Sequence, residues 1–272
     1  MKSRITGGPT RPLFQATVLD RHDVAYHRCI ETGFIQTDEP VWLAEAYESP
    51  ITVLDVGYVS RNQRCAEVAG KILARAKLPN GPCLDYGGGY GLFVRLMRDA
   101  GHDFYCFDPY CTNLFAQSYS SRPQRSDVFS LVTAFEVFEH LVDPHQVLDE
   151  LSCYTDTILL STELVPSKQI SAVDDWWYFG PEHGQHVSFY TRKALNTLAE
   201  RHGMQCHSDG KSFHLFTSRD LSRVFGNHLT GAISSMAHFV ARSADRAFGF
   251  TKGSRLQSDY ETAVRKVRGR AQ

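Results

Sequence analysis

The sequence predicts an α/β fold in which a mostly parallel sheet ends in an antiparallel pair. Three observations support this prediction. From Cys83 onward, short apolar runs alternate with amphipathic helical segments. The last two runs, 204–207 and 212–217, are too close together for a crossover helix, which predicts an antiparallel pair. Residues 1–80 and 218–272 lack this alternation, and we expect them to be flanking extensions with helical segments.

The expected N-terminal extension, residues 1–80, begins with a polar segment that we expect to be disordered. A short hairpin is expected at 24–29 and 34–36, followed by two helical stretches. The second stretch covers about 62–77, where apolar residues recur at helical spacing until the turn residues 79–82 end it.

The expected central domain, residues 81–217, contains the sheet. Pro144 begins one helix, Thr191 is the expected N-cap of another, and Gly101 and Gly203 end two of the helices. Strands are expected at 83–86, 104–108, 128–134 and 157–162, and helices at 91–100, 112–119, 144–154 and 192–201.

The expected C-terminal extension, residues 218–272, is helical. Residues 219–272 carry ten basic and four acidic side chains. Ile233, Met236, Val240, Ala244 and Ala247 share one helical face, which indicates a packing stripe rather than a membrane-binding face.

The composition excludes several classes of protein. The formal charge of −1 gives no general attraction for nucleic acid, and no apolar stretch approaches the roughly 18 residues of a membrane span. The basic N-terminus has no apolar segment behind it, so it does not predict a secretory signal. Seven cysteines without a Cys-x-x-Cys pair indicate reduced thiols and a cytoplasmic location.

A glycine-rich loop follows the first strand of the sheet and begins a helix: Cys83-Leu84-Asp85-Tyr86-Gly87-Gly88-Gly89-Tyr90-Gly91-Leu92-Phe93. A dinucleotide-binding loop would have its third glycine at the position of Leu92, so the spacing argues against a dinucleotide. Asp85 can orient the loop or bind an ammonium group, whereas it would repel a pyrophosphate. Asp108 ends the next strand, 21 residues after Gly87, where a carboxylate can bind a ribose diol.

These motifs resemble those of the class I S-adenosylmethionine-dependent methyltransferases, across about residues 83–217. Segments 129–141 and 186–191 are similar to the small-molecule branch, which includes ubiquinone-biosynthesis O-methyltransferases and enzymes that tailor sugars. The resemblance implies a Rossmann-like fold and S-adenosylmethionine as cofactor. It implies cofactor contacts from Asp85, Tyr86, Gly87, Gly88, Gly89, Asp108, Pro109, Ala134 and Phe135.

The sequence departs from this family in two places. Only about 20 residues separate Asp108 from the next clear strand, so we expect the third strand and the adenine-contacting acid after it to be reduced or absent. Gln124 and Ser126 are the candidates to replace that acid. Related chains often carry a zinc ribbon near the N-terminus, but only Cys29 remains here, so we predict no zinc in residues 1–80.

The acceptor side should lie beyond the fourth and fifth strands, because ligands bind at the carboxyl ends of strands in open α/β sheets. Four consecutive aromatic residues, 176–179, could line an acceptor pocket or form the underside of a lid. His183 and His186 are candidate catalytic bases, with packing or hydrogen bonding as the alternative role. Arg61 and Asn62 are expected at the surface or an interface.

Glu136, Glu139 and His140 are the candidate metal ligands. Residues three and four apart share a helical face, so the three side chains could converge on Mg²⁺, Mn²⁺ or Zn²⁺. Ubiquinone-pathway methyltransferases carry the same Glu-x-x-Glu-His pattern and are metal-assisted. The alternative is a role without metal, in which His140 is a candidate base.

The sequence thus predicts a methyltransferase that acts on a small molecule or glycan precursor, at oxygen, without nucleic-acid or membrane partners. An oligomer could form through either extension. Two alternatives remain open. One is a non-catalytic interaction module of the same fold, and the other is an enzyme acting on RNA or protein, to which the basic residues 265–270 would contribute.

Overall fold

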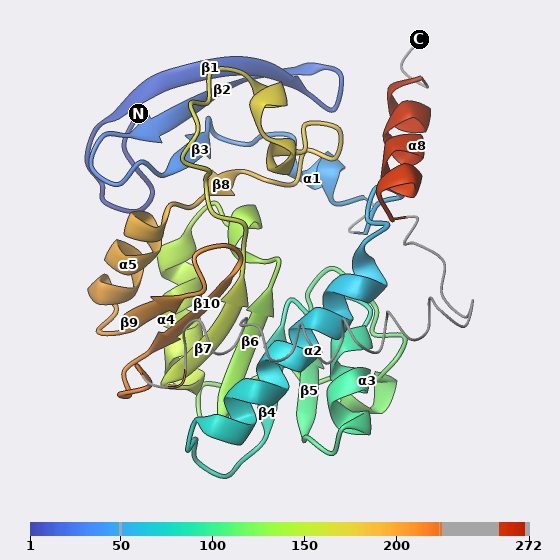
Figure 1. The fold of residues 1–272 in the computed structure, drawn as a ribbon, viewed down its shortest axis with the longest axis vertical. Coiled ribbons are helices and arrows are strands. Elements are labelled where there is room, and N and C mark those ends of the chain that lie inside the picture. Colours follow the sequence, from blue (N-terminus) through green and yellow to red (C-terminus); the bar gives the residue numbers. More distant parts are fainter. Residues whose placement is uncertain (49–50, 223, 225–255, 270–272) are drawn as a thin grey trace, which may run out of the picture.

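The computed structural model describes residues 1–48, 51–222, 224 and 256–269, which contain a six-stranded sheet below a four-stranded sheet (Figure 1). The strand orders are β5-β4-β6-β7-β10-β9 and β1-β2-β3-β8. The strands of the larger sheet are β4 (Cys83–Tyr86), β5 (Phe104–Phe107), β6 (Leu131–Phe135), β7 (Thr157–Ser161), β9 (Gln205–Ser208) and β10 (Phe213–Thr217).

The larger sheet confirms the predicted fold class. β5, β4, β6 and β7 are parallel, and β10 is antiparallel to both β7 and β9. Every residue of β7 is buried, because helices cover both faces. Ile158 and Leu160 join the core beneath α4 and α5, whereas Leu159 joins the core beneath α2 and α3. These helices are α2 (Tyr58–Arg75), α3 (Leu92–Asp99), α4 (Pro144–Tyr154) and α5 (Arg192–Arg201).

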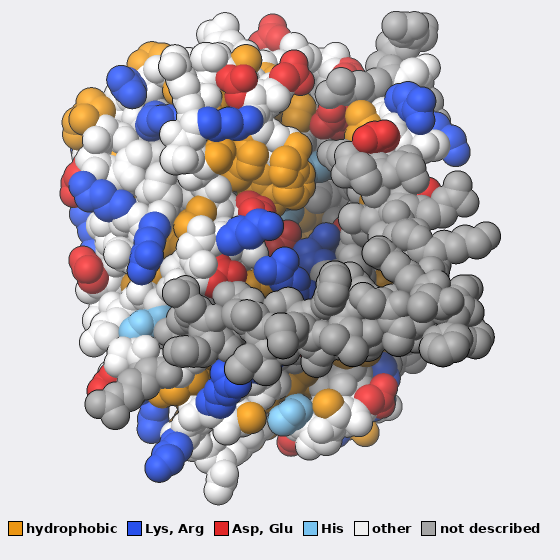
Figure 2. Space-filling model, viewed as in Figure 1, with side chains coloured by type: hydrophobic (Ala, Val, Ile, Leu, Met, Phe, Trp, Pro, Cys, Tyr) orange, Lys and Arg blue, Asp and Glu red, His pale blue; other side chains and the backbone are white. Residues whose placement is uncertain are grey.

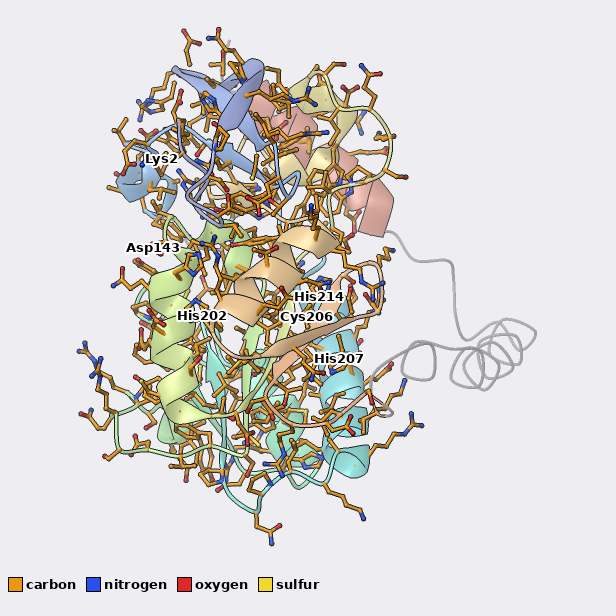
Figure 3. The ribbon with its side chains drawn as sticks, turned by 90° about the vertical axis from the view of Figure 1, so that its left-hand side faces the viewer. Lys2, Asp143, His202, Cys206, His207 and His214 are labelled. Carbon is orange, nitrogen blue, oxygen red and sulfur yellow. The ribbon has the colours of Figure 1, made fainter. Side chains whose placement is uncertain are left out.

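Two of the helices have side-chain caps at their N-termini. Thr191 accepts a hydrogen bond from Ala194 N at 3.0 Å, which confirms it as the N-cap of α5. Asp143 accepts hydrogen bonds from the backbone of His145 and Gln146 and caps α4. Asp143, and with it the start of α4, lies near the level where the two sheets meet (Figure 3).

The third strand is reduced, as predicted, to one parallel bridge between Cys106 and Ser120. The expected helix at 112–119 is wrong, because only the 3₁₀ turn η1 (Gln117–Tyr119) forms there. The Asn113 side chain accepts a hydrogen bond from Ala116 N and donates one to Ala116 O. Such bonds compete with the helical backbone pattern and favour a turn.

The smaller sheet contains β1 (Thr10–Val18), β2 (His22–Cys29), β3 (Ile35–Thr37) and β8 (Ser188–Phe189). β2 and β3 are the predicted hairpin. The sequence analysis missed β1, because a register shift between Pro12 and Phe14 breaks its alternation of buried and exposed residues. The expected disorder before β1 is also wrong, since Ile5 is buried and Arg201 donates to its carbonyl oxygen.

The rest of the described chain consists of shorter elements and one C-terminal helix. The stripe from Ile233 to Ala247 lies outside the described residues. None of the described helices combines the length and apolar character that crossing a bilayer requires. The elements are α1 (Leu43–Ala46), η2 (Phe138–His140), η3 (Val173–Asp175), η4 (Trp177–Phe179) and α8 (Leu256–Arg268).

Candidate functional site

A cavity of about 1350 Å³ lies at the carboxyl ends of β4, β5 and β6, near the junction of the two sheets. On one face of the molecule, acidic and basic side chains gather near this junction beneath a hydrophobic patch (Figure 2). The cavity wall combines the glycine loop and the ends of β5 and β6 with residues from α1, the segment leading into α2, the first turns of α4 and the loop around η4. One cavity therefore joins the predicted cofactor and acceptor regions.

The glycine loop lines this cavity through Gly87, Gly88 and Gly89. Gly87 has a φ of 73°, which other residues adopt only with strain. A Cβ atom on Gly88 would lie 2.6 Å from Asp85 Oδ2 and 2.7 Å from Cys106 Sγ. The loop therefore needs glycine both for its backbone conformation and for its close approach to the strand ends.

Asp85 is buried at the end of β4 and lines the cavity. Its Oδ1 accepts a hydrogen bond from Thr133 Oγ1 at 2.6 Å. Burial raises the pKa of Asp85 to about 7, although the Thr133 hydrogen bond opposes this shift. A cationic group placed here would favour the ionised carboxylate.

Asp108 connects the glycine loop to the turn after β5. Its Oδ2 accepts a hydrogen bond from Gly89 N, and its Oδ1 accepts from Tyr110 N and Cys111 N, all at 2.8 Å. A carboxylate offers about four acceptor positions, so one remains for a ligand hydroxyl. Of the residues predicted to contact the cofactor, Asp108, Pro109 and Phe135 line the cavity, whereas Ala134 is packed in the core and is not part of the wall.

The first turn of α2 also lines the cavity, which corrects the expectation for Arg61 and Asn62. Arg61 NH2 donates to both carboxylate oxygens of Asp55, at 2.8 and 2.9 Å. Tyr58 Oη is buried without a hydrogen-bond partner among the described residues. The available signal was spacing, because Tyr58, Asn62 and Cys65 extend the apolar stripe of α2 at intervals of three and four.

Glu136 does not join Glu139 and His140, so the structure does not bring the predicted metal ligands together. Its φ of 53° is not helical, so Glu136 lies outside the turn η2 that contains Glu139 and His140. The helical spacing on which the prediction depended is therefore absent. Its Oε1 accepts a hydrogen bond from Ser161 Oγ at 2.6 Å, and its Oε2 lies 3.8 Å from Arg61 Nε. A non-glycine residue with this φ costs about 1–3 kcal/mol and is typical of functional sites.

Glu139, His140 and His186 form the group that the structure assembles instead. One potential ligand atom from each lies within 4.8 Å of the others. Glu139 is fully buried, and Tyr178 Oη donates to its Oε1 at 2.7 Å, whereas Oε2 has no hydrogen-bond partner among the described residues. Burial, followed by the charge of Glu136, raises the pKa of Glu139.

The hydrogen bonds of the two histidines determine which ring nitrogen is free. His140 Nδ1 lies 3.2 Å from Gln185 O, and His186 Nδ1 lies 2.6 Å from Tyr178 O. A carbonyl oxygen only accepts, so each Nδ1 carries the proton and each neutral ring keeps a lone pair on Nε2. Burial, with the charge of His183, lowers the pKa of His140 to about 3.

His183 has the opposite tautomer. Gln185 N donates to His183 Nδ1 at 3.1 Å, so the proton of the neutral ring lies on Nε2. Burial lowers the pKa of His183 to about 4 and thus favours this neutral form. Of the three predicted bases, His140 and His186 therefore present acceptor nitrogens, whereas His183 presents a donor.

The four consecutive aromatic residues divide between two roles. Trp176 and Phe179 pack with Tyr26 and Phe189 beneath the smaller sheet. Trp177 is 64% exposed and lines the cavity together with Tyr178. Only part of this segment therefore faces the region expected to hold an acceptor.

Comparisons with known proteins identify similar chains. A family model described as a methyltransferase domain matches residues 58–209. No curated protein matches the chain. The similar solved structures include magnesium protoporphyrin IX methyltransferase from Synechocystis PCC 6803 with bound SAH, at 16% identity, 59% of this chain, 84% of that chain and a TM-score of 0.44. TnmH is 16% identical over 66% of this chain and 62% of that chain, with a TM-score of 0.45. CalO1, a methyltransferase in calicheamicin biosynthesis, is 15% identical over 65% of this chain and 61% of that chain, with a TM-score of 0.42.

Proposed function

The chain belongs to the methyltransferase domain family, and on that premise we propose that it transfers a methyl group from S-adenosylmethionine to a hydroxyl group of a small molecule or glycan precursor. The observation that carries the proposal is the pair of Nε2 lone pairs on His140 and His186, in the cavity that the glycine loop also lines. A hydroxyl acceptor must lose its proton during transfer, and a neutral imidazole nitrogen can accept it.

The residues around the glycine loop fit the cofactor. Bound S-adenosylmethionine supplies a methyl group activated by a sulfonium centre. Asp108 keeps an acceptor position for the ribose hydroxyls, and Asp85 provides negative charge for the ammonium group. Tyr58 Oη, which has no partner among the described residues, offers a donor to the carboxylate end. These groups position the reactants, which is the main contribution a protein makes to an in-line displacement.

The acceptor half supports a hydroxylated, ring-shaped acceptor. Trp177 presents an exposed aromatic surface for stacking, while His183 Nε2 can donate a hydrogen bond and His186 Nε2 can accept one. This combination of a stacking face and polar groups of both kinds suits a sugar or a phenol. The proposed order is acceptor binding against Trp177, followed by proton transfer from its hydroxyl to His140 or His186.

Glu139, His140 and His186 also fit a divalent cation. Glu139 Oε2 has no hydrogen-bond partner among the described residues, and the Nδ1 bonds of His140 and His186 leave a lone pair on each Nε2. Each histidine donates its Nδ1 proton to a backbone carbonyl, which is the usual arrangement for metal-binding imidazoles. A cation held there would lower the pKa of an acceptor hydroxyl. Two imidazoles favour Zn²⁺ over Mg²⁺ or Mn²⁺ among the expected ions.

The experiment is incubation of the full chain with methyl-labelled S-adenosylmethionine and a library of phenols, sugars and sugar nucleotides. Mass spectrometry should locate the label on an oxygen atom of the product. Methylation found only at carbon or nitrogen would contradict the proposal. Activity that survives excess chelator would exclude the cation and leave His140 and His186 as direct proton acceptors, whereas restoration by Zn²⁺ would support the cation.

The proposal also includes a cytoplasmic location. All seven cysteines are free thiols, which suits the reducing cytoplasm. Four further points stay predictions. These are the absence of nucleic-acid partners, the absence of zinc from residues 1–80, the three-domain division and the formation of an oligomer through an extension.

A further inference from the structure

The reduced third strand leaves the adenine side of the cofactor site without its expected recognition group. No residue between Cys111 and Phe135, all of which the structure describes, lines the cavity. The Gln124 backbone N–H bonds to Asp127, and neither Gln124 nor Ser126 is part of the cavity wall. Residues 112–134 therefore supply no side chain that could replace the missing acid.

Helix α4 places polar groups beside this part of the cavity instead. Gln146 and Glu150 are four residues apart, so they share one face of α4, and both line the cavity together with Val147. Tyr86 Oη donates to Glu150 Oε2 and Tyr154 Oη donates to Glu150 Oε1, each at 3.2 Å. The Glu150 carboxylate is therefore held next to the residue that precedes the glycine loop.

This face of α4 is close to the predicted ribose site. Tyr86, which donates to Glu150, pairs with Phe107 across β4 and β5, and Phe107 directly precedes Asp108. Tyr110 follows Asp108 by two residues and lines the same cavity. If the ribose of the cofactor binds at Asp108, the adenine attached to it can therefore reach the face of α4 that carries Gln146 and Glu150.

The chemistry of these side chains matches adenine. The Gln146 amide is exposed at the rim and has no hydrogen-bond partner among the described residues. An amide presents an acceptor beside a donor, which complements the 6-amino group and a ring nitrogen of adenine. Each oxygen of Glu150 keeps a further acceptor position. Pro109, Tyr110 and Val147 provide apolar surface for the faces of the ring.

We propose that Gln146, with Glu150 as a second acceptor, recognises the adenine of S-adenosylmethionine in place of the acid that normally follows the third strand. The two residues thereby determine the preference of the site for a 6-aminopurine. α4 carries this role because residues 112–130, the part of the β5–β6 connection where the missing acid would lie, do not line the cavity.

The test measures binding, by calorimetry, of S-adenosylhomocysteine and of its analogue in which hydrogen replaces the 6-amino group. The wild-type chain should prefer the parent ligand by about 10-fold, within the range that a bidentate contact to adenine provides. Gln146→Leu keeps the volume and should reduce this preference by about threefold or more, since it removes the amide oxygen that accepts from the 6-amino group. Glu150→Gln should reduce it by a smaller factor.

Gln124→Leu is the matched control, because it makes the same chemical change outside the cavity. It should leave both affinities unchanged, and melting curves should show that all three variants fold. Equal binding of the two ligands by the wild-type chain would overturn the inference. So would a wild-type preference that persists in both α4 variants, or one that Gln124→Leu abolishes. A wild-type chain that binds neither ligand would instead remove the cofactor premise itself.

Discussion

The proposed cofactor half and the proposed acceptor half of the cavity are built in different ways. The cofactor half uses Asp85, the glycine loop and Asp108, which lie at the ends of two adjacent parallel strands. The acceptor half combines His140, Trp177, His183 and His186 with Tyr47, from segments far apart in the sequence. This difference indicates that the proposed cofactor residues are positioned by local backbone geometry, whereas the proposed acceptor residues are positioned by long-range packing. Substitutions in the two halves should therefore have separable effects.

The largest effect is expected in the acceptor half. His186→Ala removes an acceptor nitrogen next to Glu139 and His140, and kcat should fall by about 10²–10⁴, the usual contribution of a general base. The affinity for S-adenosylhomocysteine should not change. His102→Ala, outside the cavity, is the control for loss of a histidine. Steady-state kinetics and calorimetry would contradict the separation of the halves if ligand affinity fell together with kcat.

The second effect concerns the cofactor half. Asp108→Ala removes the charged partner of the ribose hydroxyls and should weaken binding of S-adenosylhomocysteine by about 10- to 100-fold, which corresponds to about 1–3 kcal/mol. Asp108→Asn keeps an oxygen that can accept from Tyr110 N and Cys111 N, so it should lose less affinity. Calorimetry that finds Asp108→Ala as tight as the wild type would remove Asp108 from the site.

A smaller effect is expected at the mouth of the acceptor half. Trp177→Ala removes a largely exposed stacking surface, so KM for the acceptor should rise by about 3- to 10-fold, consistent with an aromatic contact of about 0.5–1.5 kcal/mol. Cofactor affinity and melting temperature should stay at wild-type values. Trp177→Phe should restore most of the acceptor affinity, and failure of this rescue would argue against stacking.

A further effect concerns stability, because the dependence of the free energy of unfolding on pH should change. The pKa of Asp85 is about 7 in the folded chain and near 3.8 in the unfolded chain. Between these values the unfolded chain loses the proton first, so the contribution of Asp85 to the free energy of unfolding falls as pH rises and becomes constant above pH 7. Asp85→Asn removes this fall, so its stability relative to wild type should increase from pH 4 to pH 7 in urea unfolding. A constant difference across that window would contradict the raised pKa.

Local patterns in the sequence were enough to predict much of the larger sheet. β4, α4 and α5 have the predicted bounds, because apolar periodicity, Pro144 and the Thr191 cap act over a few neighbouring residues. The glycine loop and Asp108 lie side by side because each follows one of two adjacent parallel strands, β4 and β5.

Tertiary structure decided the rest of the site. Glu136 was expected to point with Glu139, but its backbone conformation and its hydrogen bond with Ser161 on the next strand turn it toward Arg61. β1 and β8 entered the smaller sheet through pairing partners that local alternation does not reveal.

The sequence by itself determined the parallel sheet, the glycine loop and the position of Asp108, because each depends on residues within one strand-loop-helix unit. Only the tertiary structure decided which nitrogen His140 leaves free, since this depends on Gln185, which lies 45 residues further along the chain. It also decided that α4, and not residues 112–130, lines the cavity. The physical reason is that hydrogen bonds and packing between remote segments orient side chains after local structure has placed their backbones.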